Sequence, residues 1–372
     1  MTKAAELAKM GEVLTNSQIG RKNVVINGAM QISQRSTSVT GLGGGSGGYQ
    51  TLDRFRIGMG ATSAGRYTMS QSAVTDLSGF SNALKIDCTT ADTSIAAGEA
   101  LIIQQRLEGF NLQQIKATST STRAFTVSFY AKSNASRAIA SEITFTNGTN
   151  RQISKLHTIG TSWARYTMTV PAASSTQIDN DNSHEADLNF WIHAGSTYTG
   201  GTLNDDALDS ITNANRAAGI GSIFASTDNT LEITGLQMEV GSQATPFEHR
   251  SFGEELALCQ RYFEKSYNTG VAPAADTSAG LITTDSMGGD TTTAYLTHQL
   301  EYRVAKRAAP TVVIYDQAEA TGKVTSHATG VGTANGQTVS TEHAGDKSIS
   351  LNRASGDAAN GFRFHYTADA EL

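Results

Sequence analysis

Cysteine, proline and long apolar runs are all scarce in this 372-residue chain. Its 2 cysteines, Cys88 and Cys259, are too few for a disulfide-dense scaffold and lack metal-ligand spacing, so we expect two reduced thiols. No run approaches the roughly 18 apolar residues that a membrane-spanning helix needs, and the first residues lack the apolar stretch of a signal peptide. These absences predict a soluble protein, made in a cytoplasm, with no membrane insertion.

Charge is also limited. Only 17% of residues are charged and the net charge is −6, with no cluster of Lys and Arg beyond scattered pairs, so no general attraction to nucleic acid is expected. By contrast, 36 residues are glycine and 38% are hydrophobic. The apolar residues stand in alternating runs that can be buried, which predicts a folded, loop-rich β protein. The length favours two domains.

Motifs of catalysis and cofactor binding are missing. The glycine run at residues 41–48 lacks the Gly-Lys-Ser/Thr ending of a phosphate-binding loop and precedes a strand pattern. The eight histidines form no HExxH arrangement, and no GxSxG elbow occurs. The sequence has no fixed-period repeat of the kind that marks a β-helix. The sequence therefore predicts a protein without cofactor that is not an enzyme.

Short alternating runs separated by turn-rich loops fill residues 23–250. Side chains of a strand alternate between its two faces, so such runs predict half-buried strands. Since no long helices intervene, we expect a mainly β fold, an antiparallel β-sandwich of jelly-roll type. The expected strands are residues 24–26, 55–57, 84–86, 125–131, 143–145, 166–170, 188–192 and 231–240, the last with a kink at Gly235.

Residues 251–267 are predicted to form a linking helix. Ser251 with Glu254 fits a capping box, and Leu256, Cys259 and Phe263 would share the buried face of the helix.

Two further segments flank these parts of the chain. Residues 268–372 indicate a second β domain, sandwich-like, with strands at 312–315, 348–351 and 362–366. Residues 1–22 fit a short amphipathic helix, which is marginal alone and must pack on another surface, or else a frayed terminus.

Aromatic side chains give the candidate binding residues. Trp191 and His193 share one face of their expected strand, and Tyr130 lies on the outward face of another. If the two strands are neighbours, Trp191 and Tyr130 could stack a sugar ring, with His193 beside them. The alternative is that Trp191 is covered by a loop, by the helix or by a neighbouring subunit.

An acidic stretch at residues 179–183 raises the question of a metal. Asp179 and Asp181 offer oxygens at alternating positions, which Ca²⁺ would accept. However, His184 stands where an EF-type loop needs glycine, and Phe190 where it needs glutamate. We therefore expect a solvated acidic turn and no metal site, with the calcium question open.

Several motifs follow one another in an order that carries a resemblance. These are NVVINGAMQISQRSTSV, YQTLDRFRI, GFSNALKID, LIIQQRLEG, TNANR and ITGLQMEVGSQATPFEHRSFGEELALCQRYFEKS, which together span residues 23–267. In them the chain resembles the β-sandwich module of bacteriophage tail fibre and receptor-binding proteins, particularly those of marine and cyanobacterial short-tailed phages. The ending FHYTADAEL also resembles such fibres, and Val24 and Val25 stand where leucine and isoleucine are more typical.

The resemblance implies a function and a set of partners. It implies a homotrimeric fibre in the virion tail, docked on a tail or adaptor protein through residues 1–22, with residues 268–372 facing the receptor. The module is similar to carbohydrate-binding modules, which implies a host surface glycan such as lipopolysaccharide. Two alternatives are a capsid or tail decoration fibre without receptor specificity and, less favoured, a polysaccharide-degrading tailspike.

Overall fold

The computed structural model describes Lys3 and residues 21–45, 47–174, 176–284, 295–328, 332–354 and 361–372. The expectation for residues 1–22 lies outside this part of the chain, apart from Lys3, Arg21 and Lys22. The chain forms two compact units. The first comprises residues up to Gln31, Thr37–Phe252 and Leu372, and the second comprises Ile32–Ser36 and Gly253–Glu371. The motif NVVINGAMQISQR is therefore divided between the two units.

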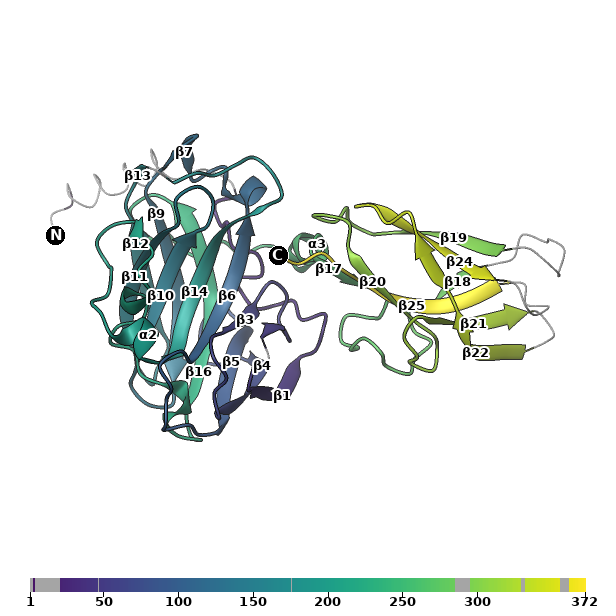
Figure 1. Cartoon of the computed structure of the whole chain (residues 1–372), viewed down its shortest axis with the longest axis horizontal. Helices are drawn as coiled ribbons and strands as arrows, with labels where there is room; N and C mark the ends of the chain where they lie inside the picture. The colour runs from purple at the N-terminus through teal and green to yellow at the C-terminus, as the bar shows by residue number, and fades with distance from the viewer. Residues whose placement is uncertain are drawn as a thin grey trace. The chain divides into compact units, whose positions relative to one another are not determined.

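Two antiparallel sheets form the first unit, as Figure 1 shows. One, called sheet A here, has the order β1 (Ser38–Gly43), β4 (Arg66–Ala73), β5 (Asn82–Thr90), β16 (Thr230–Val240), β9 (Phe125–Ser133) and β12 (Ala164–Val170). The other, sheet B, has the order β15 (Asp209–Ser210), β11 (Arg151–Ile159), β10 (Arg137–Phe145), β14 (His184–Ala194), β6 (Ala100–Glu108), β3 (Arg56–Met59) and β2 (Gly48–Tyr49). This confirms the predicted mainly β, sandwich-like fold.

The short elements of the first unit lie mostly in its loops. They are the sheet of β13 (Ala173–Ser174), β8 (Ser121–Thr122) and β7 (Lys116–Thr118), the helix α2 (Ser196–Thr199), and the 3-10 turns η1 (Gly109–Leu112), η2 (Asn213–Asn215) and η3 (Ile223–Ala225). Residues 205–216 contain β15 and η2.

Alternation along the strands decides what lies between the sheets. In β9, Phe125, Val127 and Phe129 are fully buried in the core, and in β14 Leu188, Phe190 and Ile192 join the same cluster. Burying a large apolar side chain stabilises a fold by roughly 1.5–3 kcal/mol, so these inward rows hold the sandwich together.

The kink expected at Gly235 is present in β16. The pairing of β16 with β9 shifts register between Thr234 and Gln237. Gly235 has a φ of 60°, and a Cβ there would lie 2.7 Å from the Phe80 ring and 2.8 Å from the Tyr130 ring. A side chain is therefore excluded at this bulge.

The predicted strand at residues 24–26 is wrong. Val24 and Val25 are buried, and the Val24 amide donates to the Met238 carbonyl over 2.9 Å, but no ladder forms. Asn27 and Met30 follow with φ values of 62° and 57°, a left-handed backbone that turns the chain away from a strand. The segment is a buried turn.

The second unit is built around β25 (Gly361–Asp369). The first of its two sheets has the order β17 (Phe263–Lys265), β25, β21 (Lys323–Ala328) and β22 (Gly332–Thr338), and β18 (Ile282–Thr284) and β20 (Thr311–Tyr315) also pair with β25. The other has the order β19 (Tyr295–Glu301), β24 (Ser348–Ala354) and β23 (Ser340–Glu342). Phe364, Leu351 and Val324 are fully buried in its core.

The predicted helix at 251–267 is too long. Helix α3 spans Phe252–Gln260, directly after Ser251, and buries Cys259 as expected. Phe263 is buried too, but it lies in β17, opposite Asp369 of β25. Pairing with a strand about a hundred residues later ends the helix early, because tertiary contacts override local propensity.

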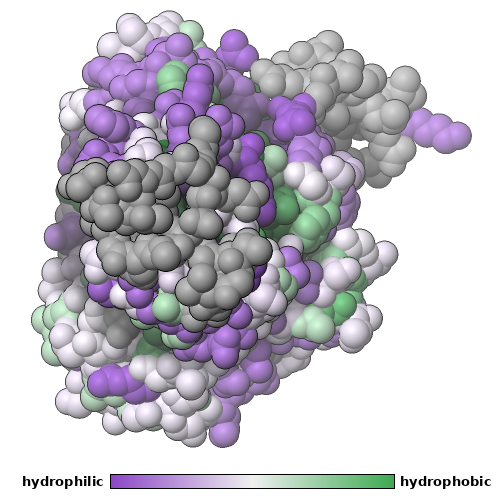
Figure 2. Space-filling view, turned by 90° about the vertical axis from the view of Figure 1, so that its right-hand side faces the viewer, coloured by the Kyte–Doolittle hydropathy of each residue, from purple (hydrophilic) through white to green (hydrophobic). Residues whose placement is uncertain are grey.

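Both cysteines are buried, and no disulfide joins them. In the described part of the chain, the large apolar side chains exposed at the surface are Ile95, Phe110, Leu156 and Phe252. On the face shown in Figure 2, hydrophilic and intermediate residues predominate, with some hydrophobic residues among them. No helix in the described part of the chain is long and apolar enough to cross a membrane.

A buried ion pair generates a prediction for the second unit. Lys306 Nζ lies 2.6 Å from Glu264 Oε2, and both side chains are fully buried. Burial lowers the pKa of Lys306, while Glu264 opposes that shift. Replacing Lys306 with Met leaves the Glu264 carboxylate uncompensated and should cost about 3–5 kcal/mol. Urea unfolding of the second unit measures this, with the exposed Lys347→Met as a control expected within about 0.5 kcal/mol of the wild type. Similar losses for both variants would contradict the argument.

Candidate functional site

A polar network covers the outer face of sheet B. Because Ile139 and Ile143 of β10 point into the core, Glu142 between them points outward, yet its side chain is fully buried. Its carboxylate accepts hydrogen bonds from Asn189 Nδ2 at 2.9 Å, from Trp191 Nε1 at 2.8 Å, and from Arg216 Nε and Nη2, both at 2.8 Å. Burial lowers the pKa of Arg216, the Glu142 carboxylate raises it, and the net shift is upward. Arg216 therefore remains charged, and it forms an ion pair with Glu142.

The indole of Trp191 lies beneath this polar network. Its side chain is 1% exposed, its ring centroid lies 5.0 Å from that of Tyr198, and the Arg216 guanidinium carbon lies 4.8 Å from the centroid of the indole. Tyr198 and Arg216 belong to the loop that follows β14. A sugar cannot stack on the indole in this arrangement, and the alternative that a loop covers Trp191 is the observed one.

Tyr130 is on the opposite side of the sandwich from Trp191. Its strand β9 belongs to sheet A, whereas Trp191 lies in β14 of sheet B. Tyr130 is half-buried in an aromatic cluster, with its ring centroid 5.3 Å from that of Phe80, which in turn packs on Phe247 and His249. The condition for one face carrying both Trp191 and Tyr130 is therefore not met, because the two strands lie in different sheets.

His193 is also buried, at 0% exposure. Its Nδ1 lies 2.8 Å from Ser222 Oγ and its Nε2 lies 3.1 Å from Glu99 Oε2. A serine, histidine and carboxylate in a row can activate a nucleophile, but Ser222 Oγ already accepts from the Phe224 amide at the start of η3. We interpret the row as a structural network, in which burial lowers the pKa of His193 and the contact with Glu99 raises it, with a net lowering.

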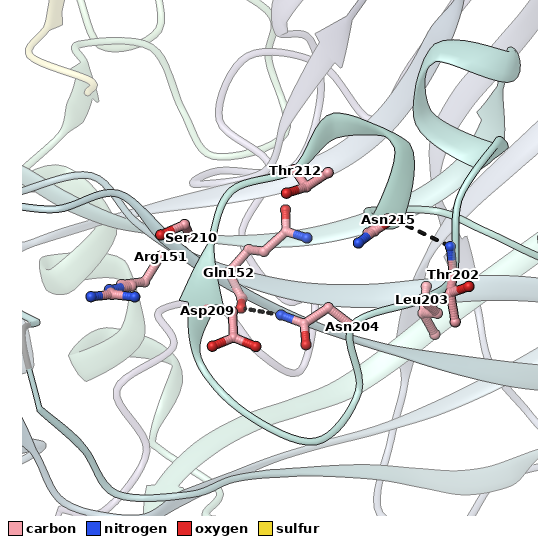
Figure 3. A pocket seen from close by; sticks show the side chains of 9 residues that line it. All are labelled: Arg151, Gln152, Thr202, Leu203, Asn204, Asp209, Ser210, Thr212 and Asn215. Atoms are coloured by element: carbon pink, nitrogen blue, oxygen red, sulfur yellow. Dashed lines mark hydrogen bonds between the residues drawn. The ribbon is translucent and has the colours of Figure 1, made fainter.

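A pocket opens at one edge of sheet B, beside the covering loop. It has a volume of about 520 Å³. Its walls come from β11, β15, η2 and the loop between α2 and β15, and Figure 3 shows them. The lining residues are Arg151, Gln152, Thr202, Leu203, Asn204, Asp209, Ser210, Thr212 and Asn215.

Local hydrogen bonds hold the pocket in shape. Asn204 Nδ2 donates to the Gln152 carbonyl at 2.9 Å, and the Thr202 amide donates to Asn215 Oδ1 at 3.2 Å, both drawn in Figure 3. The Ser154 amide donates to the Asn204 carbonyl at 2.7 Å, which ties the loop to β11. The loop is therefore fixed on both sides of the pocket.

Gln152 is the unusual residue of the pocket. Its side chain is 0% exposed, and neither Nε2 nor Oε1 has a hydrogen-bond partner within the protein. A buried polar group without a partner costs about 1–3 kcal/mol, so such groups are rare without a reason. Both atoms are fully buried, so a ligand hydroxyl reaches them only if the hydrogen bonds that tie the loop to β11 open.

The remaining polar side chains suit the same kind of ligand. Asp209 and Thr212 are exposed, and Arg151 and Asn215 are half-buried. Together they offer carboxylate acceptors, guanidinium and amide donors, and a hydroxyl, and Leu203 adds an apolar surface. Sequence reasoning missed Gln152, although Thr212, Asn215 and Arg216 belong to the motif TNANR that carries the family resemblance.

Comparisons with known proteins stop short of an identity. No family model and no curated protein matches the sequence. Similar solved structures include the enzymatically active domain of tailspike protein 4 of bacteriophage CBA120, at 15% identity and a TM-score of 0.29 over 59% of this chain. This likeness spans only 21% of the tailspike structure.

Carbohydrate-binding modules are also among the similar structures. TmCBM61 in complex with β-1,4-galactotriose has 10% identity and a TM-score of 0.28, covering 59% of this chain and 99% of the module. The family 11 module of a cellulosomal cellulase of Clostridium thermocellum has 12% identity and a TM-score of 0.27, with coverages of 55% and 96%. Likenesses this low carry no argument about function.

The unpartnered amide of Gln152 yields a prediction. Gln152→Leu removes a buried polar group that has no partner within the protein, so the free energy of unfolding should stay the same or rise. The matched control is Gln237→Leu, because Gln237 is equally buried but bonds Glu239 Oε1 and the Glu248 amide, each at 2.7 Å. That control should lose about 1–3 kcal/mol. Equal losses in urea unfolding would show that Gln152 has a structural partner.

Proposed function

We propose that this chain is a viral structural protein, the subunit of a homotrimeric bacteriophage tail fibre that attaches the virion to a host surface glycan. Two observations support the proposal: the fibre-type motifs follow one another over residues 23–267, and the pocket at Gln152 is lined almost entirely by polar side chains. The single observation that carries glycan binding is the unpartnered Gln152 amide at that pocket. No catalytic step is part of the proposal.

The chemistry of the pocket favours a sugar over other ligands. Neighbouring hydroxyls of a sugar both donate and accept hydrogen bonds, which matches Asp209 as acceptor, Asn215 as donor or acceptor and Gln152 as both. Arg151 shares the pocket with Asp209, so the pocket does not present the purely basic surface that a phosphate would favour. Lipopolysaccharide is the receptor class we propose.

Trimerisation compensates for a weak site. The pocket offers no exposed aromatic ring, so each contact would be weak. Three linked sites raise the overall avidity by a factor of about 10² to 10⁴ when all can engage together. In this proposal, residues 1–22 dock the fibre on a tail or adaptor protein of the virion.

The second unit supplies a competing location for the receptor site. Residues 268–372 are proposed above to face the receptor, and they contain a pocket of about 480 Å³ lined by Gln299, Glu301, Tyr302, Ala305, Lys347 and Ser348. Loops on rigid sheets are common places for binding residues, and both units have them.

Binding to host cells tests the glycan function and its location. In the full chain, Asp209→Ala should reduce binding about tenfold or more if the first pocket is used, because a charge-assisted hydrogen bond is worth about 1.5–3 kcal/mol. Glu301→Ala makes the same change in the second unit, and the exposed Asp228→Ala is the control.

Loss of binding with Glu301→Ala alone would place the receptor site in the second unit. Unchanged binding by both, or no competition by purified lipopolysaccharide, would favour a decoration fibre, whereas shortened polysaccharide would indicate a tailspike enzyme.

The mass in solution tests the assembly. Light scattering coupled to size exclusion should give about three times the chain mass of 39.2 kDa at micromolar concentration. A monomer mass under these conditions would contradict the homotrimer.

A further inference from the structure

Three carboxylates converge at the loop before β14. Asp179, Asp181 and Glu185 each direct an oxygen to one place, and these oxygens lie within 4.8 Å of one another. Among the residues that the structure describes, this is the group of three acidic, histidine or cysteine side chains close enough to hold an ion. Proximity alone does not make a site, because exposed acidic clusters are common.

Glu185 distinguishes this cluster from an acidic surface turn. Its side chain is 1% exposed, and Oε2 is fully buried without a hydrogen-bond partner. An ionised carboxylate in this position needs a positive charge close by.

The backbone explains why Glu185 points there. The pairing of β14 with β6 shifts register between His184 and Ala186, so Glu185 is the extra residue of a β-bulge. A bulge redirects a side chain relative to the regular alternation of a strand. Glu185 is therefore turned toward the loop that carries the two aspartates.

The loop itself is fixed at several points. The amides of Gly109 and Phe110 donate to the carbonyls of Ser183 and Asp181, at 3.1 and 2.8 Å. A Cβ on Gly109 would lie 2.5 Å from the Asp179 carbonyl oxygen and 3.2 Å from Glu185 Cγ, so only glycine fits beside the cluster. The loop is thus preorganised, and it would need little further ordering when an ion binds.

We propose that Asp179, Asp181 and Glu185 bind a calcium ion. Ca²⁺ takes six to eight oxygen ligands at roughly 2.3–2.6 Å in irregular geometry, and three carboxylates from a loop and a bulge suit it. Mg²⁺ requires a near-octahedral shell of shorter bonds and retains its water. The ion would neutralise Glu185 and join the loop before β14 to the start of that strand.

The test uses the full-length protein, stripped of metal with a chelator. Titration calorimetry with calcium chloride should show one bound ion per chain. The melting temperature should rise by about 5 °C when calcium exceeds its Kd by roughly 100-fold. No heat and no shift at about 10 mM calcium, well above the Kd of weak extracellular sites, or an equal shift with magnesium alone, would overturn the assignment.

Two variants make the test specific to these residues. Glu185→Gln should lose the calcium response, and in chelator it should melt at or above the wild-type temperature because a buried charge is gone. Asp181→Asn should weaken binding at least tenfold, while the exposed Asp228→Asn should bind as the wild type does. An undiminished calcium response in Glu185→Gln and Asp181→Asn would refute the site.

Discussion

The ion pair between the buried carboxylate of Glu142 and Arg216 is the interaction on which the outer face of sheet B depends. An ionised group with no exposure is tolerated only when it is paired and hydrogen-bonded, and Arg216, Asn189 and Trp191 together provide this. Arg216 directly follows Asn215, a wall of the polar pocket. The ion pair therefore ties the loop that forms the pocket to β10, the strand next to the pocket strand β11.

Local patterns in the sequence predicted individual strands well. The run from Phe125 to Ala131 lies within β9, and residues 188–192 lie within β14, because the alternation of apolar and polar residues is a local property. Which strands become neighbours is not local. Tyr130 and Trp191 both point outward from their strands, as the alternation required, but they point out from different sheets. Sheet order depends on pairing across the whole chain, and one sequence contains little information on it.

Long-range contacts also explain where predictions from local sequence patterns failed. Phe263 fits the apolar spacing of a helix as well as that of a strand, and the partner β25, which decides between them, begins at Gly361. Similarly, the sequence indicates Asp179 and Asp181 as possible ligands, but it does not indicate Glu185, because an EF-type loop needs its glutamate at the position of Phe190. Its contribution arises from a bulge opposite β6. Nothing in the sequence distinguishes Gln152 from other polar residues, so its buried amide could not be predicted.

Both candidate sites follow one physical rule. Core-facing rows such as Phe125, Val127 and Phe129 stabilise the sandwich and leave its outer surfaces and loops to vary. Polar groups that stay buried outside the core, such as Gln152 and Glu185, do not add to that stability, because each leaves a side-chain atom without a partner. Such atoms lower the free energy of unfolding of the fold, and a ligand that pairs with them raises it again. A hydroxyl-bearing ligand matches the amide of Gln152, and a cation matches the carboxylate of Glu185.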